Sequence, residues 1–398
     1  MDIGESGNQK LVKLELIKDF QERLHKVSLP QSSTSESWRK FNFKNFNPSD
    51  FQKFQYPEFK TIQTNEYNIK SLADLDGKDL DFITQLFNKD IIKNDFFSLT
   101  NIVESQSAIF VDIKPNVVLS DVIRIARSAR MEAKGNSYSF FPLTIIRIGN
   151  NSQAKVTEIE DNLSNSENEE FSWINSFTYI YLGESAQLEF LSKQNIPSSS
   201  FHFRNLITES MSNSNLKNNQ YYTGGFRGKI RNTHLLNGKG AEFNGLAISV
   251  SSGREFVDSE TEVIHNSDHT ASSILQKTIV KDKAHHIFTG NLHIPSGLKK
   301  VRASQVNHNI SLTKSARAES IPKLEIFSED VQTSHGSTMG EIDPEQLFYL
   351  QARGLDEISA KQLLIEGFLS EIIDQFSDTI EAEKILSEMK VKIWPTKN

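Results

Sequence analysis

Cysteine is absent from this chain of 398 residues. A chain without thiols forms no disulfide bond, offers no thiolate nucleophile and builds no sulfur-ligated metal site by itself. Any soft-metal chemistry in which the chain takes part must therefore draw its thiolates from a partner.

A basic excess is also absent, because the formal net charge is -7. Proteins that bind DNA or RNA normally carry an excess of Lys and Arg that neutralises phosphates, so we expect no nucleic-acid partner. No apolar stretch is long enough to span a bilayer, and Met1–Gln9 lacks the basic start and apolar core of a signal peptide. These absences predict a cytoplasmic protein without a membrane partner.

The common catalytic motifs are missing as well. Gly225–Lys229 and Gly238–Gly240 are rich in glycine and contain a lysine, but neither has the order of a loop that wraps phosphate. There is no His-Glu-x-x-His zinc helix, and the glycines around Ser337 do not form a nucleophile elbow. The sequence therefore predicts that the chain is not an enzyme.

Helical periodicity is present in the first hundred residues. Apolar residues between Leu11 and Val27 recur at steps of three and four, and a second helix is predicted over Ser71–Phe87. An aromatic-rich segment that begins at Trp38 lies between them, and we expect its rings to pack on a larger body. We predict a helical region over residues 1–100.

Apolar and polar residues alternate from about Ile102 onward, which predicts β-strands over residues 101–340. The segments 158–170 and 211–219 are rich in Asn, Ser and Glu, and we expect both to be solvated loops. The clearest strand patterns contain Phe177, Tyr179 and Tyr181; Leu188 and Phe190; Leu246, Ile248 and Val250; and Leu324 and Ile326.

A weak internal repeat occurs in the strand region. Phe243-Asn244-Gly245 is echoed by Phe288-Thr289-Gly290, and His265-Asn266 is echoed by His308-Asn309, at a long and drifting offset. Many short strands with such an offset favour a parallel β-helix, in which each turn buries its inward residues on the next. A β-sandwich would show the same alternation and stays open as an alternative.

After Gly340 the pattern is helical again, which predicts a C-terminal helical region over residues 341–398. Asp343 with Pro344, and later Asp378 with Glu381, are helix-start signals, and the first helix should end near Gly354. A broad apolar stripe between these helices is too wide to face only one surface: Leu364, Ile365, Phe368, Leu369, Ile372, Ile373 and Phe376.

All but one of the ten histidines lie after residue 200. In a β-helix, residues one turn apart stack, so such a set could align as metal ligands. We expect these histidines to be solvated or hydrogen-bonded on a polar β surface instead. They are His202, His234, His265, His269, His285, His286, His293, His308 and His335.

The segment from Lys323 to Ile373 resembles a known family. It reads Lys-Leu-Glu-Ile-Phe-Ser-Glu-Asp-Val, then Gln-Thr-Ser-His-Gly-Ser-Thr-Met-Gly, then Glu-Ile-Asp-Pro-Glu-Gln-Leu-Phe-Tyr-Leu-Gln-Ala-Arg-Gly-Leu. This is similar to the C-terminal signature of the SufB and SufD scaffolds of iron–sulfur cluster assembly, and Ser334-His335-Gly336 is closer to SufD. Weaker agreement covers most of the chain, including Glu36-Ser37-Trp38-Arg39.

The resemblance implies a mainly β fold, a right-handed parallel β-helix flanked by N-terminal and C-terminal α-helical regions. It also implies a non-catalytic scaffold subunit that pairs with a SufB-like subunit and docks a SufC-like ATPase through its C-terminal helices. The residues expected at that docking surface are Phe348, Leu364, Ile365, Phe368, Leu369 and Ile372.

The resemblance further implies that His335 lies at the contact with SufB and is a candidate ligand of the nascent cluster. Thr333 stands where the family often has cysteine, and a threonine hydroxyl cannot replace a thiolate as an iron ligand. We therefore expect no cofactor bound to the chain alone, and at most a transient iron–sulfur cluster shared with the partner. His335 as a turn residue without a ligand role stays open.

Two alternatives remain at the level of sequence. The first is an exported or cytosolic β-helix enzyme that acts on polysaccharide, which only the repeat favours. The second is a SufB-like subunit or a self-pairing scaffold, a homodimer in isolation, because the edge strands of the family that the chain resembles join across two chains.

Overall fold

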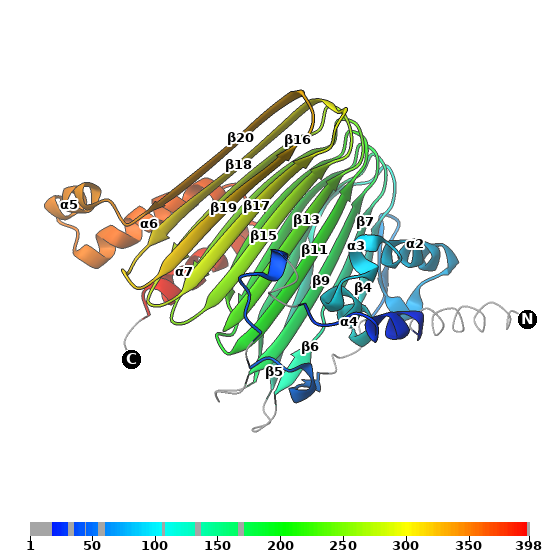
Figure 1. The fold of residues 1–398 in the computed structure, drawn as a ribbon, viewed down its shortest axis with the longest axis horizontal. Coiled ribbons are helices and arrows are strands. Elements are labelled where there is room, and N and C mark those ends of the chain that lie inside the picture. Colours follow the sequence, from blue (N-terminus) through cyan, green and yellow to red (C-terminus); the bar gives the residue numbers. More distant parts are fainter. Residues whose placement is uncertain are drawn as a thin grey trace, which may run out of the picture.

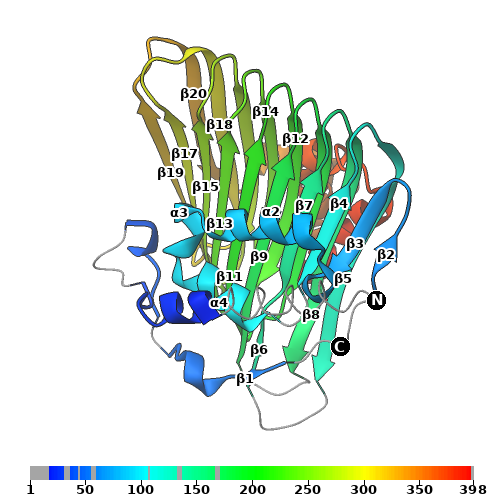
Figure 2. The ribbon, with the colours of Figure 1, turned by 90° about the vertical axis from the view of Figure 1, so that its right-hand side faces the viewer.

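The computed structural model describes residues 18–30, 36–43, 45–54, 60–105, 108–131, 137–165 and 171–395. Its body is a parallel β-coil of about seven turns, in which the chain passes alternately between two sheets (Figures 1 and 2). The sandwich alternative is wrong, because nearly all neighbouring strands pair in parallel. The predicted parallel β-helix with helical ends is confirmed.

The twelve-stranded sheet is named sheet A and the eight-stranded sheet is named sheet B. Sheet A contains β1 (Gln52–Lys53), β2 (Ile62–Gln63), β3 (Tyr67–Ser71), β4 (Ile109–Ile113), β6 (Tyr138–Phe140), β7 (Leu143–Ile148), β9 (Ser172–Leu182), β11 (Ser200–Ser210), β13 (Arg227–Leu236), β15 (Phe256–His265), β17 (His285–Ile294) and β19 (Arg317–Ile326). Sheet B contains β5 (Val118–Met131), β8 (Gln153–Asn165), β10 (Gln187–Ile196), β12 (Asn215–Gly224), β14 (Glu242–Ser251), β16 (Ala271–Val280), β18 (Lys299–Ser311) and β20 (Asp330–Gly340).

The corner that precedes sheet B contains one left-handed residue in every turn. These residues occupy equivalent positions, because the registers of the following strands align them. Asn, Gly and small polar residues reach this conformation at low cost, so such a column allows the same tight turn to repeat. The residues are Asn116, Asn151, Ser185, Asn213, Gly240, His269 and Lys300.

This column, and not the internal repeat in the sequence, marks the period of the coil. The repeat equated Phe243 with Phe288, but Phe243 lies in β14 of sheet B and Phe288 lies in β17 of sheet A. In the structure Phe243 pairs in register with Ser272 of the next turn. The internal repeat therefore does not correspond to the turns of the coil, although the β-helix that it favoured is the observed fold.

The interior of the coil is apolar along one side and polar along the other. The largest cluster of buried apolar residues includes Ile146, Leu188, Phe243 and Leu292. The polar side contains buried side chains such as Gln276, whose amide lies between Tyr222 and His286. Polar groups inside a protein are stable only when they find partners, so the polar side consists of hydrogen-bonded networks.

One of the two predicted loops is largely a strand. β8 continues to Asn165, because Glu158 and Glu160 point into the interior and meet Arg127 and Arg204 there. Burial alone would raise the pKa of Glu158, but the two guanidinium groups outweigh it and lower that pKa, whereas burial raises the pKa of Glu160. Residues 166–170 lie outside the described residues.

The second predicted loop, 211–219, is also shorter than expected. β12 already begins at Asn215, and Asn218 and Asn219 are buried in it. The polar composition that suggested solvated loops is the composition of the polar interior. Sequence alone does not separate the two, because both are rich in Asn, Ser and Glu.

The N-terminal elements cover the outer face of sheet A. Residues 18–24 are helical and are followed by the 3-10 helices η1 (Glu36–Trp38), η2 (Pro48–Asp50) and η3 (Leu72–Asp74), and by α2 (Gly77–Phe87), α3 (Asp90–Lys93) and α4 (Phe96–Glu104). The predicted helix at 71–87 is thus η3 and α2, whereas residues 11–17 of the first predicted helix lie outside the described residues. The predicted aromatic packing is confirmed, since Trp38 lies against Phe97 and Phe203.

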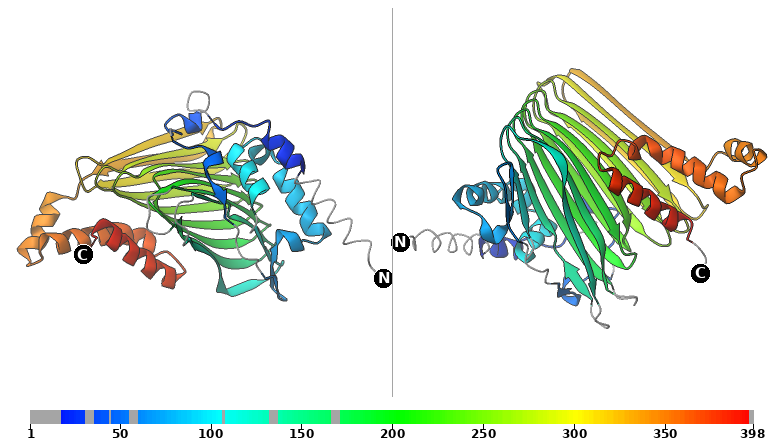
Figure 3. Two further views of the ribbon diagram at one scale, coloured as in Figure 1. Left: turned by 90° about the horizontal axis from the view of Figure 1, so that it is seen from below. Right: turned by 180° about the vertical axis from the view of Figure 1, so that it is seen from behind.

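Two C-terminal helices, α6 (Glu357–Ile373) and α7 (Thr379–Ile393), lie on the opposite side of the coil against the outer face of sheet B, whereas α5 (Pro344–Ala352) projects away from the sheet (Figure 3). Asp343 and Asp378 cap α5 and α7 as predicted, and Arg353 and the left-handed Gly354 end α5. Among the described residues, no helix has both the length and the apolar character needed to cross a membrane.

Candidate protein interfaces

The coil has an open end, formed by the last strand of each sheet. β19 pairs only with β17, and β20 pairs only with β18, among the described strands. Each of these edge strands therefore presents a row of unpaired backbone N–H and C=O groups, which is the usual template for a strand from another chain.

His335 occupies an inward-facing position of this last turn. It is in register with Gln305 of β18, and through it with Ile274 and Gly245, all of which are buried. His335 itself is exposed because no further turn covers it. Thr333 lies two residues earlier on the same face, in register with the buried Ala303.

The open end also exposes apolar surface. Leu324, Ile326 and Val331 are only half-buried, although they pack against the apolar interior. Met339 continues the inward-facing series of β20 and is 56% exposed. Apolar side chains at inward positions of an unfinished coil are the surface that an additional turn would bury.

Four of the histidines expected to be solvated or hydrogen-bonded on a polar surface are buried, and three of them (His234, His265 and His286) are hydrogen-bonded to neighbouring hydroxyl groups. His202, His234, His265 and His286 all face the interior. Burial lowers the pKa of His202, His234 and His286 to about 3 and that of His265 to about 4, so these rings are neutral at neutral pH.

The histidines do not assemble into a metal centre. His286, for example, has its Nδ1 3.1 Å from the hydroxyl of Ser249 and its Nε2 3.1 Å from that of Ser259. In the part of the chain that the structure describes, no three His, Asp or Glu side chains are grouped so that they could hold a metal ion. His335 thus stands as a single imidazole on an exposed edge.

A second candidate surface lies on α5 and the beginning of α6. Of the residues predicted to dock a partner, Phe348 is 71% exposed. Leu364 and Phe368 are half-buried, whereas Ile365, Leu369 and Ile372 are buried against sheet B. Packing of α6 on sheet B therefore accounts for much of the apolar stripe. The buried residues of the stripe attach the helix to the coil.

Sequence reasoning missed most of the residues that do expose apolar surface in this region. Tyr349, Leu355, Ile358 and Leu363 are each exposed over a third or more of their surface. With Phe348, these exposed apolar residues of α5, of the connection to α6 and of the first half of α6 are named here the α5–α6 patch. The sequence signal that could have identified this surface is the apolar character of α5, a short helix. None of the residues of α5 is buried.

Lysines of sheet B donate to backbone carbonyl groups of the two long C-terminal helices. Lys277 donates to the carbonyl oxygen of Phe368 in α6, and Lys281 donates to that of Ile393 at the end of α7, at 2.7 Å. Ile393 is the last residue of α7, and the free carbonyl groups at a helix C-terminus carry partial negative charge, so the ammonium group of Lys281 stabilises this helix end.

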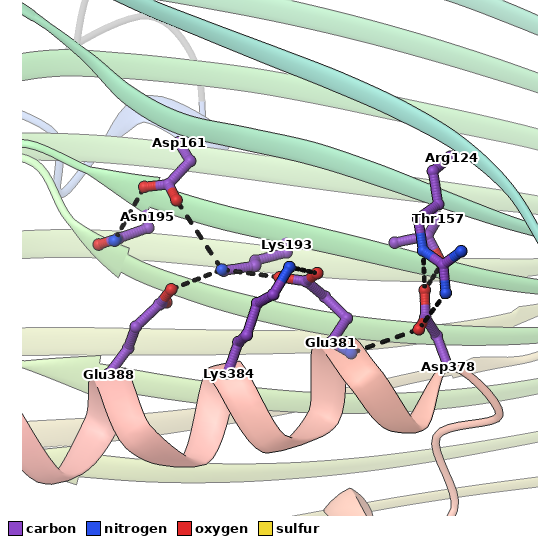
Figure 4. A network of polar contacts seen from close by, with 9 residues as sticks. All are labelled: Arg124, Thr157, Asp161, Lys193, Asn195, Asp378, Glu381, Lys384 and Glu388. Carbon is purple, nitrogen blue, oxygen red and sulfur yellow. Dashed lines mark hydrogen bonds and ion pairs between the residues drawn. The ribbon is translucent and has the colours of Figure 1, made fainter.

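The inner side of α7 forms a polar network with the coil (Figure 4). Lys193 of β10 lies between Glu381 and Glu388, with an Nζ–Oε1 distance of 2.8 Å to Glu381. Asp378 accepts hydrogen bonds from Arg124 at 2.7 and 3.0 Å. Burial would raise the pKa of Asp378, but the bonds from Arg124 and other donors outweigh it and lower that pKa.

Comparison with known proteins identifies relatives of the β-coil. The family model described as "SUF system FeS cluster assembly, SufBD core domain" matches residues 130–368, more than half of the chain. An iron–sulfur cluster assembly SufBD family protein of Synechocystis is 30% identical over 240 residues, which is 59% of this chain and 52% of that protein.

Two relatives are named iron–sulfur cluster assembly protein SufD. The Escherichia coli protein is 35% identical over 156 residues, 39% of this chain and 36% of that protein. The Bacillus subtilis protein is 30% identical over 162 residues, 41% of this chain and 37% of that protein. The matches thus span about half or less of the length of these relatives.

Proposed function

This chain belongs to the SufB/SufD family of iron–sulfur cluster assembly proteins and is SufD-like, and from that premise we propose that it is a non-catalytic scaffold subunit. In this proposal the chain pairs with a SufB-like subunit, docks a SufC-like ATPase and works in the cytoplasm. None of the relatives reported above is named as a polysaccharide enzyme, so that alternative is not carried further.

The observation that carries the proposal is the open end of the coil. β19 and β20 leave backbone groups unpaired. Half-buried apolar residues at inward positions of this end, such as Leu324 and Ile326 of β19, are not fully covered. A second β-coil that continues both sheets would satisfy the backbone and bury these side chains at once. The SufB-like subunit is the partner that the family suggests for this end, and a homodimer in isolation would use the same edge.

The α5–α6 patch is the surface that we assign to the ATPase. Its residues are exposed, and they lie on the helices that the family uses for docking. Aromatic anchors such as Phe348 and Tyr349 typically supply much of the energy of a protein interface. The buried residues Ile365, Leu369 and Ile372 act indirectly, because they attach α6 to sheet B.

His335 is the only candidate cluster ligand that we assign to this chain. A neutral imidazole nitrogen can bind iron, and the ring lies on the edge that a partner would cover. The iron–sulfur cluster is the cargo of the complex. Its thiolates would come from the partner, because this chain has no cysteine and Thr333 cannot replace one.

The test is co-expression of the chain with the SufB-like and SufC-like chains of the same organism. We expect the three proteins to co-purify through a tag on any one of them, and to elute together in size-exclusion chromatography. Light scattering on the isolated chain would determine whether it also dimerises alone. Persistent failure of the chain to retain either partner would contradict the proposal.

A further inference from the structure

The N-terminal segment 36–43, named here the strap, crosses the outer face of sheet A. Its central anchor is Trp38, which is buried and stacked on Phe97 of α4 with a centroid distance of 5.0 Å. Lys229 and Arg231 of β13 lie over the indole ring at 5.7 and 5.4 Å. A stacked, cation-covered tryptophan is a strong attachment point for a segment with little regular structure.

The strap continues from this anchor across the next turns. Ser37 Oγ donates to Glu260 Oε1 of β15 at 3.2 Å, and the ring of Phe41 lies 6.1 Å from that of Phe256 in the same strand. A hollow of about 160 Å³ lies between strap and sheet, and Ile287 and Thr289 of β17 contribute to its lining.

Two charged residues of the strap form ion pairs with the edge strand β19. Lys40 forms an ion pair with Glu319, and Glu36 forms one with Lys323. Glu319 also pairs with His285 Nε2 of β17 at 2.8 Å, so the strap, β17 and β19 share one carboxylate. The strap thereby ties an N-terminal segment of the chain to one of the last strands.

These contacts matter because β19 is an edge strand. It pairs with β17 on one side only, and its residues are half-buried or exposed along their whole length. An edge strand held by one ladder opens more readily than a central strand. The two ion pairs with the strap, which act as tethers, attach to β19 at positions four residues apart on its outer face. They therefore restrict both the separation of β19 from β17 and the twist of β19.

We propose that the strap is a positioning device for subunit assembly: Glu36 and Lys40 hold β19 in the arrangement that the partner subunit pairs with. This inference rests on the proposed function, because it assumes that the open end is the partner's binding site. The strap residues themselves do not touch the partner in this proposal. They act through the position of β19.

The test reverses the charges of the strap with the double substitution Glu36→Lys and Lys40→Glu. In the isolated chain, we expect amide hydrogen exchange in β19 to become about threefold faster or more at low salt, because both tethers become repulsive. Affinity for the SufB-like chain should fall about three- to tenfold. The side chains of these pairs are substantially exposed, so both effects should shrink at about 0.5 M salt.

Rescue and a matched control separate electrostatics from unfolding. Adding Glu319→Lys and Lys323→Glu restores opposite charges at both pairs, and it should restore slow exchange and tight binding. Glu357→Lys disrupts the exposed pair with Lys361 on α6 and should change neither readout. Unchanged exchange in β19 after the strap reversal, or loss of exchange protection that the compensating changes fail to restore, would overturn the inference.

The two readouts also distinguish the strap from the proposed function. A wild-type chain that shows no binding to the SufB-like chain refutes the proposed function and the assembly role of the strap together. Faster exchange in β19 with unchanged binding refutes the assembly role alone. Faster exchange and weaker binding, both reversed by the compensating changes, support the inference.

Discussion

Lys193 and Glu381 are 188 positions apart in the chain, yet their side chains form an ion pair of 2.8 Å in which both are almost completely buried. Lys193 lies in β10 and Glu381 in the first turn of α7, so this pair joins the coil to the last helix (Figure 4). Neighbouring charges share this network, because Lys193 also pairs with Glu388 and Asp161, and Glu381 also pairs with Lys384.

Removal of this lysine should destabilise the attachment of α7. Lys193→Met leaves the buried Glu381 and the adjacent Glu388 without their shared cation, which we expect to cost about 3 kcal/mol. Urea denaturation monitored by circular dichroism measures the loss. Lys361→Met removes a half-buried lysine whose ion pair with Glu357 lies at the surface of α6, and it should change stability by less than about 0.5 kcal/mol. Equal effects of the two substitutions would show that the buried network is not what fixes α7.

Acid should destabilise the coil at mild pH, because the buried histidines must become charged when the chain unfolds. The pKa of His286 is lowered from 6.5 to about 3, and the unfolded chain therefore binds more protons than the folded chain over that interval. The contribution of the buried neutral ring to the free energy of unfolding is fully present above about pH 6.5. It decreases as the pH falls toward about 3. Each such ring contributes about 1.4 kcal/mol per pH unit within its interval.

A histidine substitution checks this origin of the pH dependence. His286→Gln should make the stability curve between pH 6 and pH 4 shallower by about 1.4 kcal/mol per pH unit, measured by urea denaturation at several pH values. His335→Gln removes an exposed imidazole and is the control, which should leave the slope as it is in the unaltered chain. A slope that does not respond to His286→Gln would place the acid sensitivity in the carboxylates.

The open end should tolerate a charge in the isolated chain but not in the complex. Met339→Asp places a carboxylate at an exposed inward position of β20, so the free chain pays little, whereas pairing with a second coil would bury the charge. We expect at least a tenfold loss of affinity for the SufB-like chain in titration calorimetry. Val118→Asp, on β5 at the other end of sheet B, should leave that affinity unchanged. A normal affinity of the Met339 variant would exclude this edge as the interface.

Truncation of the α5–α6 patch should affect only the ATPase. The double variant Phe348→Ala and Ile358→Ala removes exposed apolar anchors, and we expect it to weaken binding of the SufC-like chain by about 2 kcal/mol or more, with thermal stability retained. Val391→Ala, an equally exposed position on α7, serves as the matched control. The assignment fails if both variants bind the SufC-like chain as tightly as the unaltered protein.

His335→Ala should lower the iron and sulfide content of the assembled complex without preventing assembly. The imidazole is exposed on the edge strand, so its loss leaves no buried group unsatisfied in the free chain. Colorimetric iron and sulfide assays on the co-purified complex measure the effect. His293→Ala, which removes an imidazole paired with Glu325 on the outer face, should leave the content unchanged. Full cluster content in the His335 variant would remove the ligand role.

Several features of the fold could be predicted from the sequence because they depend on near neighbours. Asp343 and Asp378 cap their helices through N–H groups two or three residues away, so the sequence alone locates both helix starts. Alternation along Leu246, Ile248 and Val250 identifies a strand for the same reason. The absence of cysteine likewise excludes thiolate chemistry without any knowledge of the fold.

The candidate interfaces were predicted less well. Phe348 and Ile365 are both apolar residues of the C-terminal region, but one is 71% exposed and the other 2%. No local pattern distinguishes them, because the difference arises where α6 meets sheet B. His335 was singled out through the family resemblance, and only the register with Gln305 places it on the inward face of the open end.

The sequence by itself determined that this chain is thiol-free and consists of strands between helical ends, since alternation, capping and composition act over a few residues. The tertiary structure alone decided which polar residues are buried and which apolar residues are free. Glu158 and His286 lie inside because partners on other strands satisfy them, and Met339 is uncovered because it lies on the edge strand at the open end. Burial depends on contacts between segments far apart in the chain, and a linear pattern does not contain that information.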